Sequence, residues 1–470
     1  MLTHAVEIND IVKNKIKEDS NVSIRGWVKS TRNYGKISFI ELNDGSCIEN
    51  LQIVAKTENT KGYEQAIKSS RTGSALLAIG LLKKSEKNES GYELVADEIT
   101  LLKDSDEDYP LQKKEHSLEF LRDIAHLRPR SKTFQAIFRI RSKLSFAMHK
   151  YFNENDFVWV ATPLITGSDA EGAGDSFVLQ DDPKSPLFDK KASLTVSGQL
   201  HGEAFAQAFK KIYTFGPTFR AEHSHTFRHA NEFWMIEPEI AFCNLLQLQF
   251  FIEDFIKYIT KYIISECPSE LEIFYKEKPF LKQRIETIVS SEYKKLDYID
   301  AIKILNDAVK SGVKFDDGVT EFKFGTDIGT PEERYLCEKI FNCPVFLQNL
   351  PLEMKAFYMK QNPKEKWYTG DDKLEGFSGV TVAANDLLIP GVGEVIGGSQ
   401  REDEGQKIID EAEKRKIDLS TIQWYIDLRK YGYHSSSGFG IGFERMLMVL
   451  LDLNIRDSIP FPRTPGVLKF

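Results

Sequence analysis

The stretch Lys211-Ile-Tyr-Thr-Phe-Gly-Pro-Thr-Phe-Arg-Ala-Glu222 alternates apolar residues with small or charged ones. Successive side chains of a β-strand point to opposite faces, so this period of two predicts a strand with Arg220 and Glu222 on the face away from the core. After a polar loop, Glu232-Phe-Trp-Met-Ile-Glu-Pro-Glu-Ile-Ala-Phe242 alternates in the opposite phase and turns Phe233, Glu237 and Glu239 to one side. Together the two strands present an arginine, several acids and an aromatic ring to a shared surface.

A solvated sheet face is the simpler interpretation of those charged side chains. Phe233 lies among the acids, however, and a purely solvated face has no need of a flat aromatic ring. Pro217 and Pro238 within the strands also argue against an ordinary exposed sheet. We therefore favour a binding surface.

A third strand is predicted in Ser437-Gly-Phe-Gly-Ile-Gly-Phe-Glu-Arg-Met-Leu-Met-Val-Leu-Leu451. Its glycines at 438, 440 and 442 share one strand face and leave bare backbone that a flat ligand can approach. Glu444 and Arg445 then open an apolar helix, whose N-terminus favours anions. A glycine strand alone is more often a packing device, but beside the other two strands it indicates nucleotide binding.

Two acids, Asp386 and Glu394, stand in a glycine-rich and otherwise apolar stretch that runs from Asn385 to Arg401. Mg²⁺ is commonly held by one or two carboxylates together with substrate phosphates, so this pair predicts a magnesium site. The glycines of the stretch miss the G-x-G-x-x-G spacing of a dinucleotide loop. The array His223, His225 and His229 lacks a fourth ligand nearby, and we expect loop histidines there, not a metal site.

Composition restricts the class of protein. The five cysteines are scattered and contain no C-x-x-C pair, which is typical of a reducing cytosol. The net charge of −8 argues against a protein that coats nucleic acid without sequence preference. The first residues show no secretory signal pattern, and charged residues interrupt the apolar run 240–264. We expect a cytoplasmic protein that does not enter the membrane.

The chain is too long for one ordinary core, and its pattern divides it. Residues 1–105 show five strand-like runs and predict an OB-fold β-barrel. Residues 106–130 are expected to form a linker or hinge, since the run from Lys103 to Pro110 is acidic and aperiodic. Residues 131–470 mix long helices with strands, and 267–312 is expected to be a helical insertion.

Taken together, these stretches resemble the class II aminoacyl-tRNA synthetases, and within them the asparaginyl branch of the aspartyl, asparaginyl and lysyl subgroup. Phe219-Arg-Ala-Glu with Arg228-His and Glu232-Phe resembles the family's second motif, and Gly438-Phe-Gly-Ile-Gly-Phe-Glu-Arg445 its third. Thr162-Pro163 and the preceding helix resemble the first motif, which forms dimers. The resemblance implies an α+β fold, in which an OB-fold barrel is followed by a catalytic domain built on an antiparallel sheet flanked by helices, in a homodimer.

The resemblance also implies roles for individual residues. Arg220 and Arg228 would hold the α- and γ-phosphates of ATP, and Phe233 and Arg445 would sandwich the adenine. The remaining nucleotide contacts would come from Glu222, Glu394, Gly440 and Gly442, and Mg²⁺ would bind Asp386 and Glu394. The ammonium and backbone of the amino acid would be held by Glu171, Ser197 and Gln199. Glu222 and Arg401 would read its side-chain amide, which needs one acceptor and one donor.

The implied activity is ATP-dependent activation of L-asparagine followed by its transfer to tRNA(Asn). Aspartyl relatives carry a lysine at the position of Gly202, and a buried carboxylate without such a partner is costly. In the barrel, Phe39 would stack on an anticodon base, with Arg32 and Gln52 as polar readers.

Two alternatives remain open from the sequence. A paralogue could form the adenylate for an acceptor other than tRNA, or the chain could be a catalytically weakened RNA-binding homologue. Tyr433-His-Ser-Ser-Ser437 stands where the family usually has a proline-histidine pair, and His223 and His225 replace the usual asparagines. These departures fall in loops near the expected ATP site and bear on its efficiency.

Overall fold

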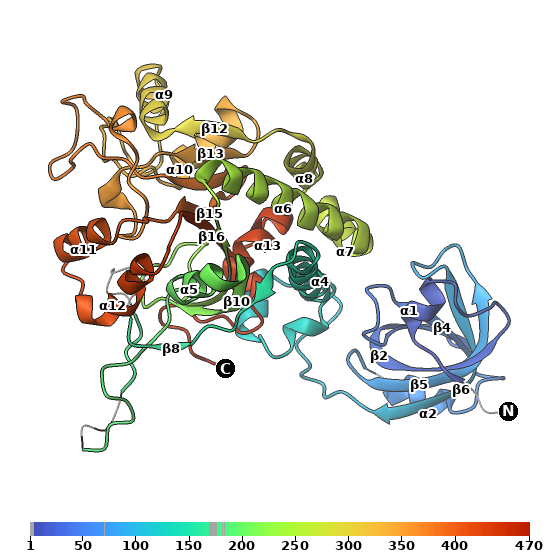
Figure 1. Ribbon diagram of the computed structural model, residues 1–470. Helices are drawn as coiled ribbons and strands as arrows, with labels where there is room; N and C mark the ends of the chain where they lie inside the picture. The colour runs from blue at the N-terminus through green and yellow to red at the C-terminus, as the bar shows by residue number, and fades with distance from the viewer. Residues whose placement is uncertain (1–3, 70, 169–175, 181, 183) are drawn as a thin grey trace. The chain divides into compact units, whose positions relative to one another are not determined.

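The computed structural model describes residues 4–69, 71–168, 176–180, 182 and 184–470. Its contacts divide the chain into two compact units, residues 1–136 and 137–470 (Figure 1). No helix among the described residues combines the length and the apolar character needed to cross a membrane.

The first unit is a closed β-barrel. Its strands are β1 (His4–Ala5), β2 (Asn21–Asn33), β3 (Ile37–Asn43), β4 (Leu51–Lys56), β5 (Ala75–Lys84) and β6 (Tyr92–Lys103). The long strand β2 pairs with both β3 and β5, and this double pairing closes the sheet. Its interior is filled by alternate aliphatic residues such as Ile24, Ile40 and Leu94. The predicted OB-fold barrel is confirmed.

Short helices accompany the barrel. They are α1 (Ile8–Val12), α2 (Tyr63–Ser69), α3 (Leu118–Asp123) and the 3-10 turn η1 (Arg128–Arg130). Ser117 caps α3 by accepting a hydrogen bond from the backbone N–H of Phe120. By contact, residues 106–130, which we expected to form a linker, group with the first unit.

The second unit is built on an eight-stranded sheet in the order β12-β13-β14-β15-β16-β11-β10-β7. The strands are β7 (Val158–Trp159), β10 (Lys211–Phe219), β11 (Glu232–Ala241), β12 (Lys294–Asp297), β13 (Val345–Gln348), β14 (Ala384–Ile389), β15 (Gly393–Gln400) and β16 (Ser436–Gly442). Pairings from β13 to β10 are antiparallel, as expected, whereas the two edge pairs, β12–β13 and β10–β7, are parallel. The sheet is therefore mixed.

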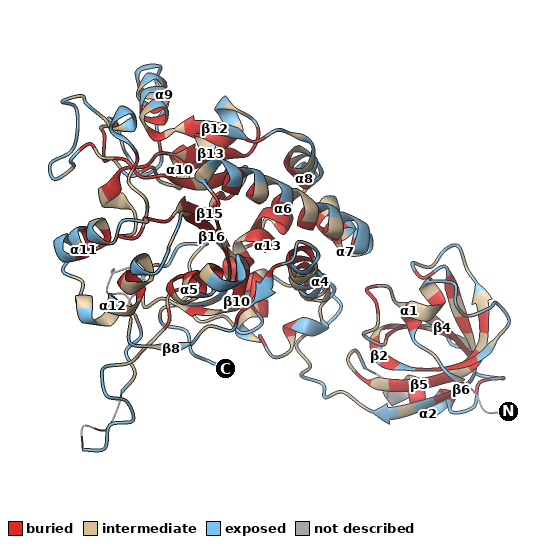
Figure 2. Ribbon diagram, viewed as in Figure 1, coloured by how far each residue is buried: buried red, intermediate tan, exposed pale blue. Residues whose placement is uncertain are grey.

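Helices pack against this sheet. They are α4 (Lys132–Glu154), α5 (Gln199–Phe209), α6 (Leu245–Glu266), α10 (Thr330–Tyr335) and α13 (Phe443–Leu451). Helix α6 begins with a capping box between Asn244 and Gln247 and lies along β15 and β16. Rings of α6 contact Phe439 of β16, so this face of the sheet is sealed. Figure 2 shows β15 and β16 as buried strands.

The segment expected to be a helical insertion contains three helices and one strand. The helices are α7 (Pro268–Glu277), α8 (Phe280–Ser290) and α9 (Tyr298–Lys310). Helices α7 and α8 pack on α6, whereas β12 joins the edge of the large sheet. Part of the segment is thus a piece of the main sheet.

The remaining elements are short. They are β8 (Ile165–Thr166) and β9 (Ser193–Leu194), which pair with each other, α11 (Gly405–Lys414), α12 (Leu419–Asp427), α14 (Ile455–Ser458), the π-turn η2 (Leu336–Ile340) and the 3-10 turns η3 (Leu352–Met354), η4 (Lys364–Lys366) and η5 (Leu428–Lys430).

Candidate active site

A cavity of about 630 Å³ opens over strands β11, β14, β15 and β16 and beside the loop that follows β10. It gathers nearly all of the residues that the sequence suggested for this domain. They are Ser197, Gln199, Arg220, Glu222, Arg228, Phe233, Asp386, Glu394, Arg401, Gly440, Gly442 and Arg445. Glu171, the remaining residue predicted there, lies outside the described residues.

The phase predicted for the first two strands is observed. In the β10–β11 register Thr218 lies opposite Phe233 and Thr214 lies opposite Glu237, so these side chains share the cavity face. The guanidinium carbon of Arg220 lies 5.5 Å from the centre of the Phe233 ring. Glu237 is only 5% exposed, which excludes the solvated-face interpretation.

The loop after β10 is held by Asn231. Its Nδ2 donates to the backbone oxygens of Arg220 and Glu222, at 2.8 and 2.9 Å. Glu222 lies 4.0 Å from Arg220 and 3.7 Å from His229. Burial lowers the pKa of His229, with Glu222 opposing the effect.

Close approach to β11 requires a glycine at position 438 of β16, whereas Gly440 meets only the flexible end of a side chain. A Cβ atom added to Gly440 would lie 2.6 Å from Cε of Met235, and one added to Gly438 would overlap the carboxylate of Glu239. The cavity floor is consequently bare backbone at Gly440 and Gly442. Next to it, Arg445 donates through Nη1 to the backbone oxygen of Glu394 at 3.2 Å and lies 3.4 Å from its carboxylate.

Asp386 and Glu394 converge over Gly397. A Cβ atom on that glycine would lie 3.6 Å from Oδ1 of Asp386 and 3.5 Å from Oε1 of Glu394. Lys355 donates to the other oxygen of Asp386 at 2.6 Å. Burial raises the pKa of Asp386 to about 6 against the opposing effect of Lys355. Burial also acts on Glu394, but Arg445 and Lys355 outweigh it and lower the pKa of that acid.

This donor set fits a divalent cation shared with phosphates. Two carboxylate oxygens face the same point, and the side chains of Arg220, Arg228, Arg445 and Lys355 line the same cavity. Such a balance of hard oxygen ligands and cations suits a polyphosphate with bound Mg²⁺.

Glu333 is a site residue that the sequence did not suggest. It lies on α10, and its Oε2 accepts from Nη1 of Arg228 at 3.2 Å and from the backbone N–H of Glu394 at 3.1 Å. Burial raises the pKa of this acid to about 7, and the charge of Glu394 adds to the rise. Neither a recognised motif nor a strand period surrounds Glu333, so only the tertiary structure reveals it.

The far end of the cavity combines an arginine with buried acids. Arg401 forms a two-pronged ion pair with Glu239, and its Nη1 donates to Oγ of Ser399 at 2.7 Å. Glu237 accepts from Ser197 Oγ, from the backbone N–H of Gly198 at 2.8 Å and from Thr214 Oγ1 at 3.1 Å. Sequence reasoning placed Glu237 on the correct face but assigned it no role.

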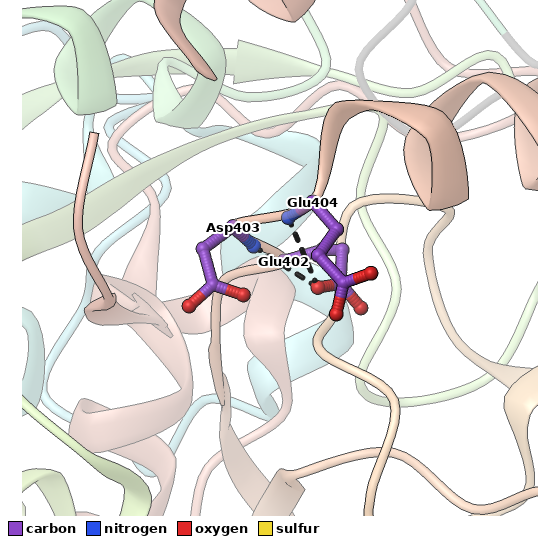
Figure 3. Close-up of side chains that lie close together, drawn as sticks. All are labelled: Glu402, Asp403 and Glu404. Carbon is purple, nitrogen blue, oxygen red and sulfur yellow. Dashed lines mark hydrogen bonds between the residues drawn. The ribbon is translucent and has the colours of Figure 1, made fainter. Parts of the chain in front are cut away.

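Arg401 is followed by three acids, Glu402, Asp403 and Glu404, whose ligand atoms are close enough to hold a metal ion (Figure 3). The backbone N–H groups of Asp403 and Glu404 both donate to Glu402 Oε1. Lys360 pairs with Asp403 and lies 3.8 Å from Glu402, and Lys407 pairs with Glu404 at 2.6 Å, so two lysines already offset most of the charge of this group. Among the described residues, the three loop histidines do not gather into such a cluster.

In the barrel, the three predicted anticodon readers lie together. Arg32 of β2 is directly opposite Phe39 of β3, with its guanidinium carbon 5.9 Å from the ring centre. Nη2 of Arg32 donates to Oε1 of Gln52 at 3.1 Å. The result is a small polar and aromatic patch on one face of the barrel.

Comparison with known proteins gives consistent matches over the whole chain. The family model of class II tRNA synthetases (D, K and N) matches residues 117–465, and that of the OB-fold nucleic acid binding domain matches residues 22–102. An asparagine–tRNA ligase of Malacoplasma penetrans is 48% identical over 468 residues, 99% of each chain. One from Mycoplasma mycoides subsp. mycoides is 49% identical over 96% of this chain and 97% of its own. The crystal structure of asparaginyl-tRNA synthetase from Pyrococcus horikoshii complexed with asparaginyl-adenylate has a TM-score of 0.86 and 28% identity, with 100% of both chains covered.

Proposed function

Because the chain belongs to the class II tRNA synthetases of the D, K and N group, we propose that it activates L-asparagine with ATP and transfers it to tRNA(Asn). One observation carries this proposal. A single cavity is lined by three arginines, by two carboxylates that converge on one point, and by Arg401, which is paired with Glu239. The chain is an ATP-using ligase, as are the asparagine–tRNA ligases that it matches over almost its full length.

ATP binds along the β10, β11 and β16 side of the cavity. Arg220 holds the α-phosphate and Arg228 the γ-phosphate, while the adenine lies between Phe233 and Arg445 over the bare backbone of Gly440 and Gly442. The bare floor and the adjacent Phe233 ring support this placement. Glu222, close to Arg220, completes the nucleotide site.

Asp386 and Glu394 hold Mg²⁺ in this proposal. The cation would supply charge neutralisation for the phosphates, and Lys355 holds the outer oxygen of Asp386 so that Oδ1 faces Glu394. Glu333 keeps Arg228 directed toward the phosphates.

The amino acid binds at the end formed by Ser197, Gln199 and Arg401. We predicted that Glu222 and Arg401 read the side-chain amide, and Glu237 is a second acid able to accept from it because it is fixed by three donors. Glu239 already balances the charge of Arg401, so the side-chain carboxylate of aspartate would bring an uncompensated negative charge to this arginine. Gly202 has no side chain and so adds no cation here, although its position faces Thr214 and Glu239.

The chemistry requires no protein nucleophile. A carboxylate oxygen of asparagine attacks the α-phosphorus in line, and pyrophosphate leaves. A hydroxyl of the terminal tRNA ribose then attacks the acyl carbon, and AMP leaves. Positioning by Arg220 and the compensation of phosphate charge by the cationic side chains account for the rate.

The barrel patch of Arg32, Phe39 and Gln52 binds the anticodon, with Phe39 as the stacking platform.

The enzyme works in the cytoplasm, which suits five cysteines that are all free and buried. It is a homodimer, and the proposed interface includes α4 and β7, where large apolar side chains stay exposed: Phe146 is 57% and Trp159 53% accessible.

Amino-acid-dependent exchange of pyrophosphate into ATP, followed by charging of tRNA, tests the proposal. We expect exchange with asparagine and not with aspartate or lysine, and charging of tRNA(Asn). Exchange without charging would point to another acceptor. A folded protein without exchange would overturn the proposal in favour of a non-catalytic homologue.

A further inference from the structure

Gln199 lies at the start of α5 and lines the cavity, although it is only 3% exposed. Its Nε2 donates to Oε2 of Glu203 at 2.6 Å, one turn further along the helix. Its Oε1 is buried and has no hydrogen-bond partner within the part of the chain that the structure describes. A buried acceptor without a partner is costly, so a ligand donor is expected to meet it.

The orientation of this amide depends on Glu203, which is fully buried. Each of its oxygens accepts twice: Oε2 from Gln199 and from the hydroxyl of Tyr425 at 2.6 Å, Oε1 from Arg429 at 2.6 Å and from the hydroxyl of Tyr433 at 2.7 Å. An ionised carboxylate only accepts hydrogen bonds and has about four lone-pair sites. Glu203 can therefore meet the nitrogen of the Gln199 amide but cannot donate to its oxygen.

The partners of Glu203 are themselves held by further contacts. The guanidinium carbon of Arg429 lies between two rings, 4.2 Å from the centre of Tyr425 and 4.1 Å from that of Tyr433. Its Nε donates to the backbone oxygen of Glu402 at 3.0 Å. The hydroxyl of Tyr433 also lies 2.6 Å from Oγ of Ser436, at the first residue of β16. Four donors, from α5, α12, η5 and the loop before β16, thus hold one carboxylate in place.

We propose that Glu203 is a positioning residue that locks the Gln199 amide with its oxygen toward the cavity, so that the site selects a substrate carrying a free α-ammonium group. The ammonium donates to Oε1 of Gln199, which no other orientation of the amide would permit. Tyr433 belongs to the segment that departs from the family pattern, and its hydroxyl makes it part of this lock. This inference rests on the proposed function.

Competition in the exchange reaction separates positioning from general stability. The two ligands are asparagine and succinamate, which is asparagine without its α-amino group. In Glu203→Gln the new amide can donate to Gln199, so the side-chain amide of Gln199 can flip and exchange the positions of its oxygen and nitrogen. We expect the KM for asparagine to rise by about tenfold to a hundredfold. The inhibition constant of succinamate and the KM for ATP should change by less than about threefold.

Gln199→Met is the second variant, because it removes the acceptor and leaves the Glu203–Arg429 ion pair intact. It should show the same selective loss, and adding Glu203→Gln to it should weaken asparagine binding no further. If Glu203→Gln alone fails to fold with Arg429 left unpaired, Glu203→Gln combined with Arg429→Met removes both charges. Equal weakening of both ligands, additive effects, or unchanged asparagine binding in Gln199→Met would overturn the inference. Absence of exchange in the wild-type protein would instead contradict the proposed function.

Discussion

Lys355 donates to Asp386 across 2.6 Å inside the cavity, and both side chains are largely shielded from solvent. The lysine therefore sets which oxygen of Asp386 is available to a bound cation. It lines the candidate active site, although no motif surrounds it that would have indicated phosphate chemistry.

Replacing this lysine should impair activation more than folding alone explains. Lys355→Met leaves a buried carboxylate beside Glu394, and we expect kcat/KM for ATP in the exchange reaction to fall about a hundredfold. Lys303→Met is the matched control, since Lys303 pairs with Asp300 on the exposed surface and should leave exchange unchanged. Exchange within threefold of wild type in Lys355→Met would contradict this role.

Removal of Arg401 should abolish asparagine activation. In Arg401→Ala the buried Glu239 loses its two-pronged partner, which costs about 3–5 kcal/mol of stability. ATP should still bind with nearly its original affinity in a calorimetric titration, because the nucleotide residues are untouched. Exchange that survives in the folded variant would show that Arg401 does not read the side chain.

The acid that reads the amide can be identified by paired substitutions. Glu222→Gln and Glu237→Gln each turn an obligate acceptor into a group that can also donate. The reader's variant should raise the KM for asparagine at least about tenfold. The other variant should leave the KM for asparagine unchanged. Glu237→Gln should leave the KM for ATP little changed, whereas Glu222→Gln should raise it as well, because Glu222 also belongs to the proposed nucleotide site. If neither variant shifts the asparagine KM, the amide is read by Arg401 without an acid.

Glu332 should make stability depend on pH. Burial raises the pKa of its carboxyl from 4.5 to about 7, and Asp317 adds to the rise. Between these values the folded protein keeps a proton that the unfolded chain has lost, so the free energy of unfolding falls as the pH rises through this window.

The total loss in the free energy of unfolding, reached above pH 7, amounts to at most about 3 kcal/mol. Glu332→Gln should lose that dependence, so denaturant unfolding at pH 5 and at pH 8 should differ less in the variant than in the wild type. An identical pH dependence in both proteins would show that Glu332 does not carry the effect.

The dimer can be tested at β7. Trp159→Glu places a charge at an exposed apolar edge of the sheet and should convert a particle of twice 53.7 kDa into one of 53.7 kDa in light scattering. Phe280→Glu is a control on α8, where a ring of similar exposure should tolerate the charge. A monomeric wild type, or a Trp159 variant that remains dimeric, would contradict the proposed interface.

The two-residue alternation of the strands and the spacing of the glycines sufficed to predict the cavity floor. Phe233 and Gly440 lie where alternation along their strands puts them, since the face of a strand is a local property. Arg220 and Glu222, which we predicted on the first strand, reach the cavity from the loop just beyond the end of β10. The parallel edges β7 and β12 could not be predicted in this way. They span only Val158–Trp159 and Lys294–Asp297, too few residues for a period to be visible.

The partners of the site residues were also beyond local reasoning. Arg228 meets Glu333 across 105 positions of sequence, and Glu203 meets Arg429 across 226. Such pairs are chosen by tertiary packing, and a charged residue on a helix gives no sign of whether it will face solvent or a buried partner. The barrel was easier to predict because its strands follow one another with clear alternation.

Gly438 leaves room for a buried acid, whereas Gly440 and Gly442 line the cavity. It lies directly opposite Glu239, and the smallest side chain there would push that carboxylate off Arg401. A single methyl group in the strand associated with adenine should therefore be felt as a failure to discriminate between amino acids. The strand that borders the proposed adenine site thus also holds in place the Glu239–Arg401 pair on which the choice of amino acid depends.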